Sequence, residues 1–190
     1  MTRCILILSA LLVLNGCAAP LLIGGAAATG VVVANDRRTA GTMLDDERIE
    51  IQVLGLVAKD QELVDRSHLN VTSYNGIVLL TGEVEDEVIG QRIADIARKE
   101  TKVREVKNEL RIGPVSTPSS RSRDAILTTR VKSRLVTNSS VDGTAVKVIS
   151  ENGTVFLMGL VSLPEAASAV EVTRSTDGVQ RIVKVFEYVQ

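Results

Sequence analysis

The chain has 190 residues, 45% of them hydrophobic and 24% charged, which is the composition of a globular protein with one ordinary domain or two small ones. Aromatic residues make up only 2% and Trp is absent, so the stacking platforms that bind single-stranded nucleic acid are nearly missing. The net charge of −1 gives no overall attraction for phosphate backbones. These three properties exclude nucleic acid as an expected partner.

The N-terminus has the layout of a secretory signal. Arg3 precedes an apolar run over 4–14 that is too short to span a bilayer, so we expect residues 1–16 to be removed. The sequence LNGC at 14–17 resembles the bacterial lipobox, Leu-x-Gly-Cys, although Asn15 stands where small residues are commoner. The resemblance implies that Cys17 is the lipid anchor, with an S-diacylglycerol and an N-acyl group. The alternative is an ordinary signal peptide followed by an incidental cysteine.

The cysteine chemistry of the mature chain follows from this assignment. Cys4 leaves with the signal and Cys17 becomes a thioether, so no thiol remains for a disulfide, a metal or a nucleophile. Ala18 follows the anchor where inner-membrane lipoproteins carry Asp, and resemblance to sorted lipoproteins therefore implies the outer membrane, periplasmic face.

Residues 17–44 are expected to form the acylated cysteine and a flexible tether. The apolar part at 21–34, LLIGGAAATGVVVA, contains several glycines and is too short to cross a bilayer. A membrane-inserted hairpin or a small-residue packing stripe is the alternative.

The rest of the chain is an internal repeat. YNGIVLLTG at 74–82 returns at 151–159 as ENGTVFLMG, and the same shift of 77 positions aligns Ile49 with Ile126. The copies cover 45–112 and 122–190, with a Pro/Ser linker at 113–121. Two small domains are therefore expected.

Each copy shows the same order of elements. In the first, a helix follows the Asp cluster at 45–46, a hairpin joins strands at 69–74 and 77–84 through Asn75-Gly76, a helix carries Ile89 and Ile93, and a strand closes at 103–112. The second copy repeats this with helices near 124–136 and 164–176. The prediction is an α+β fold of two tandem α-β-β-α-β two-layer sandwiches. Each has a three-stranded mixed sheet with one face covered by two helices.

Few residues could support catalysis. His68 is the only histidine, which excludes a Ser-His-Asp triad and a His-rich metal site, and we interpret it as a surface residue ahead of a strand. The acidic group over 83–87 is interpreted as negative charge at a helix N-terminus, not as a metal site or a carboxylate pair. We expect no enzyme, no metal and no cofactor other than the acyl groups on Cys17.

The two copies differ in net charge. Residues 45–112 hold ten basic and fifteen acidic side chains, whereas residues 121–190 hold nine basic and seven acidic ones. On the first helix of the second copy, an arc of roughly 80° contains a candidate phospholipid-binding set, namely Arg123, Ile126, Arg130 and Arg134. An anionic membrane should attract this face. Ile126 either meets lipid there or packs in the domain core or between the two domains, since the repeat pairs it with Ile49.

The repeated pattern V.V....NG.V.L.G.V, the helix after it and the closing strand resemble those of BON domains. The whole mature chain is similar to the dual BON-domain outer-membrane lipoproteins of Gram-negative bacteria, most closely over 36–50 and 151–161. It departs at Lys102-Val103, where the usual Gly is missing, whereas Gly178-Val179 keeps it.

The resemblance implies binding of anionic phospholipids of the outer membrane through the second domain, support of outer-membrane integrity and enrichment at the division site. It also implies a link to the outer-membrane protein assembly machinery. The alternative is an adaptor whose acidic first domain and open sheet edges dock onto assembly or cell-wall remodelling factors.

Overall fold

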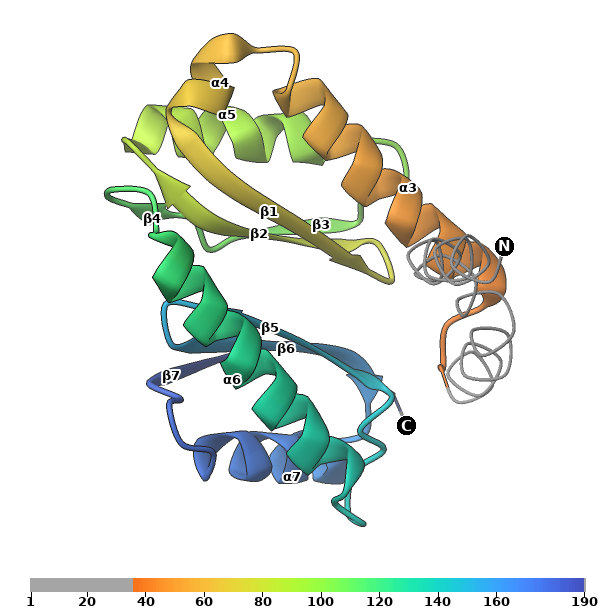
Figure 1. Ribbon diagram of the computed structural model, residues 1–190. Helices are drawn as coiled ribbons and strands as arrows, with labels where there is room; N and C mark the ends of the chain where they lie inside the picture. Colours follow the sequence, from red (N-terminus) through yellow and green to blue (C-terminus); the bar gives the residue numbers. More distant parts are fainter. Residues whose placement is uncertain (1–35, 190) are drawn as a thin grey trace, which may run out of the picture. The chain divides into compact units, whose positions relative to one another are not determined.

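The computed structural model describes residues 36–189, so the expected signal peptide, Cys17 and most of the expected tether lie outside the described part of the chain. The described residues form the expected α+β fold, with two mixed sheets and helices packed on each (Figure 1). No helix within 36–189 is long and apolar enough to cross a bilayer.

The first domain begins with a helix that starts earlier than expected. Its elements are α3 (Ala40–Val57), α4 (Gln61–Asp65), β1 (Ser67–Tyr74), β2 (Ile77–Val84), α5 (Glu87–Arg98), β3 (Glu105–Asn108) and β4 (Arg111–Ile112). Thr39 is the N-cap of α3, and its hydroxyl accepts a hydrogen bond from the backbone N–H of Thr42 at 3.1 Å. Asp45 and Asp46 therefore lie in the second turn instead of starting the helix, and the end of the expected tether is helical.

The second domain also starts earlier than its helix was expected to. Its elements are α6 (Pro118–Val136), β5 (Val146–Glu151), β6 (Thr154–Val161), α7 (Leu163–Arg174) and β7 (Arg181–Tyr188). Thr117 caps α6 by accepting from the N–H of Ser120 at 3.2 Å, and Pro118 occupies the first helical position, where a missing N–H costs nothing. The end of the expected linker is therefore the first turn of α6.

The strand order is β1-β2-β3 in the first sheet, with β4 also paired to β2, and β5-β6-β7 in the second. Both predicted hairpin turns are confirmed, because Asn75 and Asn152 have φ angles of 52° and 50° and the glycines after them also have positive φ. The third strand of each sheet runs parallel to the second. In the first sheet that strand was predicted to be unbroken, but it is split into β3 and β4 around residues 109–110.

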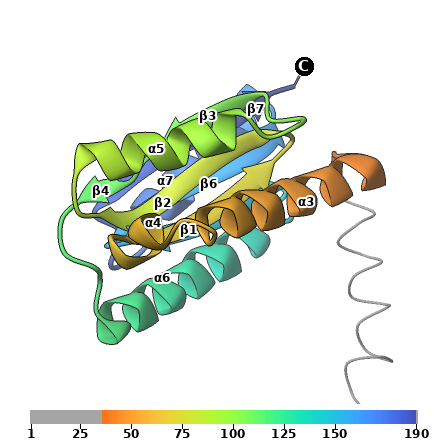
Figure 2. The same cartoon turned by 90° about the horizontal axis from the view of Figure 1, so that it is seen from above.

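Each sheet is buried on two faces, whereas one buried face was predicted. Helices cover the outer face of each sheet, as α3 and α5 do over the strands of the first (Figure 2). On the inner faces, alternate residues of the two sheets pack against each other in an interdomain core formed by Tyr74, Ile77, Leu79, Phe156, Met158 and Val185. Successive side chains of a strand point to opposite faces, so the apolar runs of β2 and β6 each contribute to two cores.

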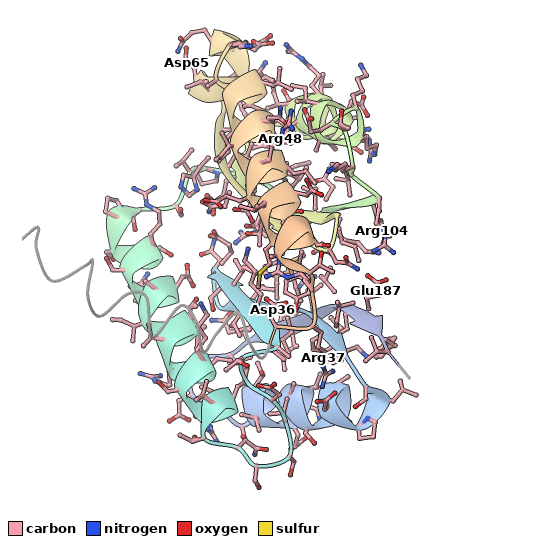
Figure 3. All side chains as sticks on the ribbon, turned by 90° about the vertical axis from the view of Figure 1, so that its right-hand side faces the viewer. Asp36, Arg37, Arg48, Asp65, Arg104 and Glu187 are labelled. Carbon is pink, nitrogen blue, oxygen red and sulfur yellow. The ribbon has the colours of Figure 1, made fainter. Side chains whose placement is uncertain are left out.

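Ion pairs across the domain boundary surround the interdomain core. They join Arg104 to Glu187 at 3.0 Å, Arg181 to Glu109 at 2.8 Å and Lys147 to Glu50 at 3.0 Å. Arg104 and Glu187 can be followed in Figure 3, where each lies at the edge of its own domain. These ion pairs join the two domains around the shared core.

Two members of the acidic group over 83–87 have different roles. Asp86 is the N-cap of α5 and accepts from the N–H of Ile89 at 3.0 Å, as the capping interpretation predicted. Glu83 lies buried in β2 and accepts from the side-chain amide of Asn152 in the other domain at 3.1 Å. The interpretation of His68 as a residue ahead of a strand was wrong. It lies within β1, 3.3 Å from the Glu83 carboxylate.

Candidate functional site

Helix α6 has one buried face and one cationic face. The buried face carries Asp124, Leu127, Val131 and Leu135. The solvent-exposed surface of the helix carries five cations, namely Arg121, Arg123, Arg130, Lys132 and Arg134. The ion pairs found among residues 36–189 include none of these five, so their charge is not neutralised by neighbouring carboxylates.

The buried aspartate fixes the rotation of α6 over its sheet. The Asp124 carboxylate accepts from the backbone N–H groups of Asn152 and Gly153, at 2.9 and 3.1 Å, in the turn between β5 and β6. In the first domain, Asp46 makes the same two contacts with the turn between β1 and β2. The aspartates are 78 positions apart in the sequence, so the first helices are related by a shift of 78.

The shift of 78 explains the position of Ile126. When the two first helices are aligned with this shift, Leu127 is equivalent to the buried Ile49, and Ile126 faces outward with 58% of its surface exposed. The expectation that Ile126 could pack in the core was wrong, because a one-residue shift rotates a helical position by about 100°. Ile126 is an exposed apolar side chain between Arg123 and Arg130.

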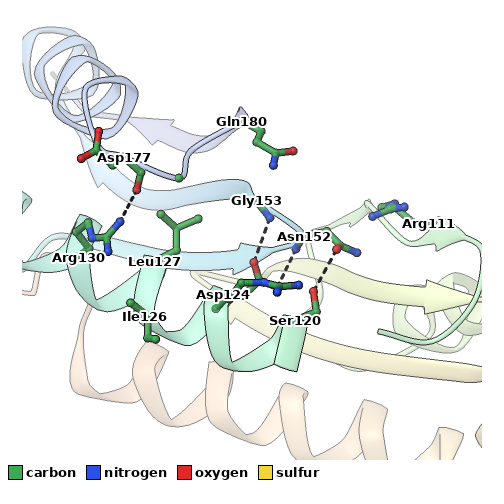
Figure 4. Close-up of a pocket in the computed structure, with 12 residues that line it drawn as sticks. Arg111, Ser120, Asp124, Ile126, Leu127, Arg130, Asn152, Gly153, Asp177 and Gln180 are labelled. Atoms are coloured by element: carbon green, nitrogen blue, oxygen red, sulfur yellow. Dashed lines mark hydrogen bonds between the residues drawn. The ribbon is translucent and has the colours of Figure 1, made fainter. Parts of the chain in front are cut away.

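A hollow of about 630 Å³ lies beside this face of α6 (Figure 4). Three of the four predicted site residues line it, namely Arg123, Ile126 and Arg130, and Ile126 also lines a neighbouring apolar depression of about 380 Å³. The turn after β5 and the loop between α7 and β7 complete the wall. The hollow is therefore a partly apolar concavity with guanidinium groups along one side.

The arginines of α6 differ in how they are held. Nη1 of Arg130 donates to the carbonyl oxygen of Asp177 at 2.7 Å, which fixes the guanidinium at the margin of the hollow (Figure 4). Arg134 does not line the hollow. Its guanidinium donates to the Ser175 carbonyl oxygen and, at 3.0 Å, to the Ser175 hydroxyl at the end of α7. Arg134 therefore joins α6 to α7, a role that its place on the cationic arc did not predict.

Among the residues of the hollow that the sequence did not predict, Arg111 is the one that adds a cation. Arg111 belongs to β4 of the first domain, is exposed and lines the hollow together with Arg123. Its sequence signal was weak, because a cation at the end of an edge strand is an ordinary surface feature. The packing of the two domains brings it to the second domain.

The hollow offers groups that bind anions. Guanidinium groups donate several hydrogen bonds in a planar arrangement that matches phosphate oxygens. Of the two acidic residues in the wall, Asp124 and Asp177, the Asp124 carboxylate is already occupied by the hairpin turn. Among residues 36–189 no three His, Cys, Asp or Glu side chains are placed to hold a metal ion.

Comparison with known proteins places both halves of the chain in one family. The family model described as "BON domain" matches residues 45–114 and 123–190. The outer membrane lipoprotein DolP of Haemophilus influenzae is 40% identical over 96% of this chain and 94% of its own length. A 21 kDa hemolysin of Actinobacillus pleuropneumoniae is 41% identical over 82% of this chain and 80% of its own length. The osmotically-inducible protein Y of Escherichia coli is 24% identical over 80% of this chain and 77% of its own length.

Proposed function

Because the chain belongs to the family of dual BON-domain outer-membrane lipoproteins, we propose that it is a non-enzymatic lipoprotein whose second BON domain binds anionic phospholipid through α6. The protein is anchored at Cys17 on the periplasmic face of the outer membrane, enriched at the division site, and supports the integrity of that membrane.

The observation that carries the proposal is the exposure of Ile126 between Arg123 and Arg130. An apolar side chain flanked by unneutralised guanidinium groups matches the boundary between acyl chains and anionic headgroups, where each cation contributes about 1 kcal/mol. The hollow beside it has room for a headgroup, and Arg111 adds a further cation from the first domain.

With a lipid anchor at Cys17, the contact between α6 and lipid is not needed to bring the protein to the membrane. Burial of acyl chains contributes about 0.8 kcal/mol per CH₂, so a triacylated Cys17 alone would hold the chain on the bilayer. A tethered second contact then operates at an effective concentration that approaches millimolar for short flexible linkers. Weak headgroup binding by α6 is therefore enough to set the orientation and lateral position of the protein. Cys17→Ala should abolish incorporation of covalent lipid label, and retention of label would rule out the anchor.

Vesicle co-sedimentation of the mature chain without acyl groups tests the lipid contact. Binding should be saturable and salt-sensitive with phosphatidylglycerol vesicles and absent with phosphatidylcholine vesicles. Arg123→Glu combined with Arg130→Glu should lower the affinity at least about tenfold, because two attractions become repulsions.

The matched control reverses two exposed cations of the first domain, Lys59→Glu with Lys99→Glu, which change the net charge equally. If the two double variants lost vesicle affinity equally, net charge alone would explain the effect, and the assignment of lipid binding to α6 would be overturned. Arg134 is a poorer test position than Arg130. Reversal of Arg134 breaks its hydrogen bonds with Ser175 and Thr176, whereas reversal of Arg130 breaks the single bond to the Asp177 carbonyl.

A second candidate function is that of an adaptor for the outer-membrane protein assembly machinery or for cell-wall remodelling factors. The observation in its favour is the excess of acidic side chains over 45–112, which gives the first domain a charge opposite to that of α6. Absence of binding to both kinds of vesicle would favour this function.

A further inference from the structure

Strand β7 is the open edge of the second sheet. Within the described residues it pairs only with β6, in parallel over its whole length from Arg181 to Tyr188. The N–H of Arg181 donates to the Gly153 carbonyl just ahead of β6, and the N–H of Val189 donates to the Val161 carbonyl at the end of β6. The odd-numbered residues of β7 therefore direct their backbone groups toward β6. In a parallel pair, alternate residues turn both backbone groups to one side. Ile182, Lys184 and Phe186 therefore direct N–H and C=O toward the open side.

The equivalent edge of the first sheet does not offer a continuous strand for pairing. There the strand is divided into β3 with four residues and β4 with two, and the chain departs from strand geometry between them. Short or interrupted edges are a common protection against pairing with other chains. The second domain instead presents eight consecutive strand residues.

A groove of about 340 Å³ runs between α7 and this edge. Its floor is apolar, because the half-buried Val170, Val179 and Ile182 pack against the core of the second domain. Its rim is cationic, with Arg174 and Lys184 on either side. Among residues 36–189, no acidic side chain lines this groove.

The rim cations are open to a new partner. Arg174 pairs with Glu171 at 3.1 Å, but both side chains are about two-thirds exposed, so water and salt screen the pair strongly. Arg181 pairs with Glu109 at 2.8 Å and is 61% exposed. Lys184 forms no ion pair with any residue of 36–189. A carboxylate brought into the groove would therefore meet weakly engaged or unengaged cations.

We propose that the α7–β7 groove binds an extended acidic peptide segment of a partner protein, which adds to the sheet as a fourth strand beside β7. Backbone pairing supplies affinity and the groove supplies specificity in this mode of recognition. Alternate side chains of the added strand face α7, where apolar groups meet Val170 and Ile182 and carboxylates meet Arg174 and Lys184. The proposal does not depend on lipid binding by α6, because only Gln180 lines both the groove and the hollow.

The probe is a synthetic, N-acetylated octapeptide, Thr-Val-Thr-Glu-Thr-Val-Thr-Glu, titrated into the mature chain without acyl groups. Its alternate residues place both Val and Glu on the face that meets α7. NMR should show saturable binding, with slowed hydrogen exchange at the amides of Ile182, Lys184 and Phe186. Two peptides serve as controls, one with Lys in place of Glu and one N-methylated at alternate residues so that it cannot form a ladder. Failure of the parent peptide to bind, equal binding by either control, or perturbation confined to another surface would overturn the proposal.

Two kinds of variant separate charge from backbone pairing. Arg174→Glu with Lys184→Glu should weaken peptide binding at least about tenfold, since two attractions become repulsions. Lys184→Pro removes one outward N–H without touching the bonds to β6 and should abolish binding. Lys184→Ala is its matched control, because it removes the same cation but keeps the N–H, and it should weaken binding less. If the proline variant does not fold, the charge-reversed pair still decides the question. Undiminished binding by either folded variant would contradict strand addition.

Vesicle-binding measurements on the same variants distinguish a peptide-binding groove from a membrane-binding surface. Arg123→Glu with Arg130→Glu should leave peptide affinity unchanged, and the groove variants should leave binding to phosphatidylglycerol vesicles unchanged. Loss of vesicle binding in the groove variants, with no peptide binding in the parent, would mean that the cations serve a bilayer and would overturn the proposal.

Discussion

The two BON domains share a buried framework and differ on the surface that this framework presents. In both, an aspartate in the first helix accepts from the hairpin turn, and the following apolar positions face the sheet. At the positions between them, Asp45, Arg48 and Gln52 of α3 are replaced by Arg123, Ile126 and Arg130 of α6. The fold therefore depends on the buried stripe, while the exposed positions are free to differ. The two domains thus share one buried scaffold but present different surfaces.

The largest expected effect tests the shared framework. Asp46 is buried and accepts from Asn75, Gly76, Ser73 and Arg38, whereas Asp124 accepts from two backbone N–H groups. Removal of a buried acceptor leaves its donors unsatisfied at about 1–3 kcal/mol for each group. Asp46→Ala should lower the free energy of unfolding by about 4 kcal/mol and Asp124→Ala by about 2 kcal/mol, measured by urea denaturation. Equal losses would show that the two aspartates contribute alike.

The next effect tests whether the surface difference accounts for lipid binding. Asp45→Arg with Gln52→Arg places on α3 the two cations that α6 has at the equivalent positions, beside the exposed Leu44 and Ile51. The affinity for phosphatidylglycerol vesicles should rise at least about tenfold, at about 1 kcal/mol per added cation. The control, Glu87→Arg with Gln91→Arg on α5, adds the same charge elsewhere in the first domain. An equal rise in the control would show that position on the helix is irrelevant.

The strands could be predicted from the sequence more closely than the first helices. Asn-Gly pairs determine hairpin turns locally, and β2 covers 77–84 as predicted. The shift of 77 that aligns the strands fails in the first helices, where the buried aspartates require 78. No local signal marks that one-residue difference, yet it rotates Ile126 from the core to the surface.

The parts of the site that depend on distant contacts could not be predicted. The partner of Arg134 is a backbone carbonyl 41 residues away, and backbone groups carry no sequence signature. Arg111 reaches the hollow only because the two sheets pack through their inner faces. An apolar run such as that of β2 does not reveal which layers cover its two sides.

A smaller effect concerns the position where the repeat loses its glycine. Lys102 has a φ of 70°, and Gly178 near the same point of the second domain has a φ of 98°. A non-glycine residue in this region costs about 1 kcal/mol, so Lys102→Gly should raise the free energy of unfolding by up to about that amount. Lys102→Ala is the control, since it removes the exposed ion pair with Asp45 and keeps the Cβ atom. If both variants change stability equally, backbone strain at Lys102 has no role.

The smallest effect is a pH dependence that comes from the contact between Arg37, just ahead of α3, and Glu165 in the second domain. Arg37 donates two hydrogen bonds to Glu165 in the first turn of α7, and this contact lowers the pKa of the Glu165 carboxyl to about 2 from an ordinary value of 4.5. A lowered pKa in the folded state means that the contact stabilises the fold above the ordinary pKa. That contribution is lost as the pH falls toward the folded-state value.

Because Arg37 is one-third exposed, Arg37→Ala should lower the free energy of unfolding at neutral pH by less than about 1 kcal/mol. The difference from the parent should narrow between about pH 5 and about pH 3 as Glu165 becomes protonated in the unfolded chain. In the first domain, Arg66 lowers the pKa of two carboxyls but is the main cause for neither, since the Ile89 N–H comes first for Asp86 and Arg92 comes first for Glu62. Arg66→Ala should therefore change the pH dependence less. Urea denaturation across this pH range measures both variants. A difference for Arg37→Ala that does not narrow on acidification would assign its effect to packing instead of charge.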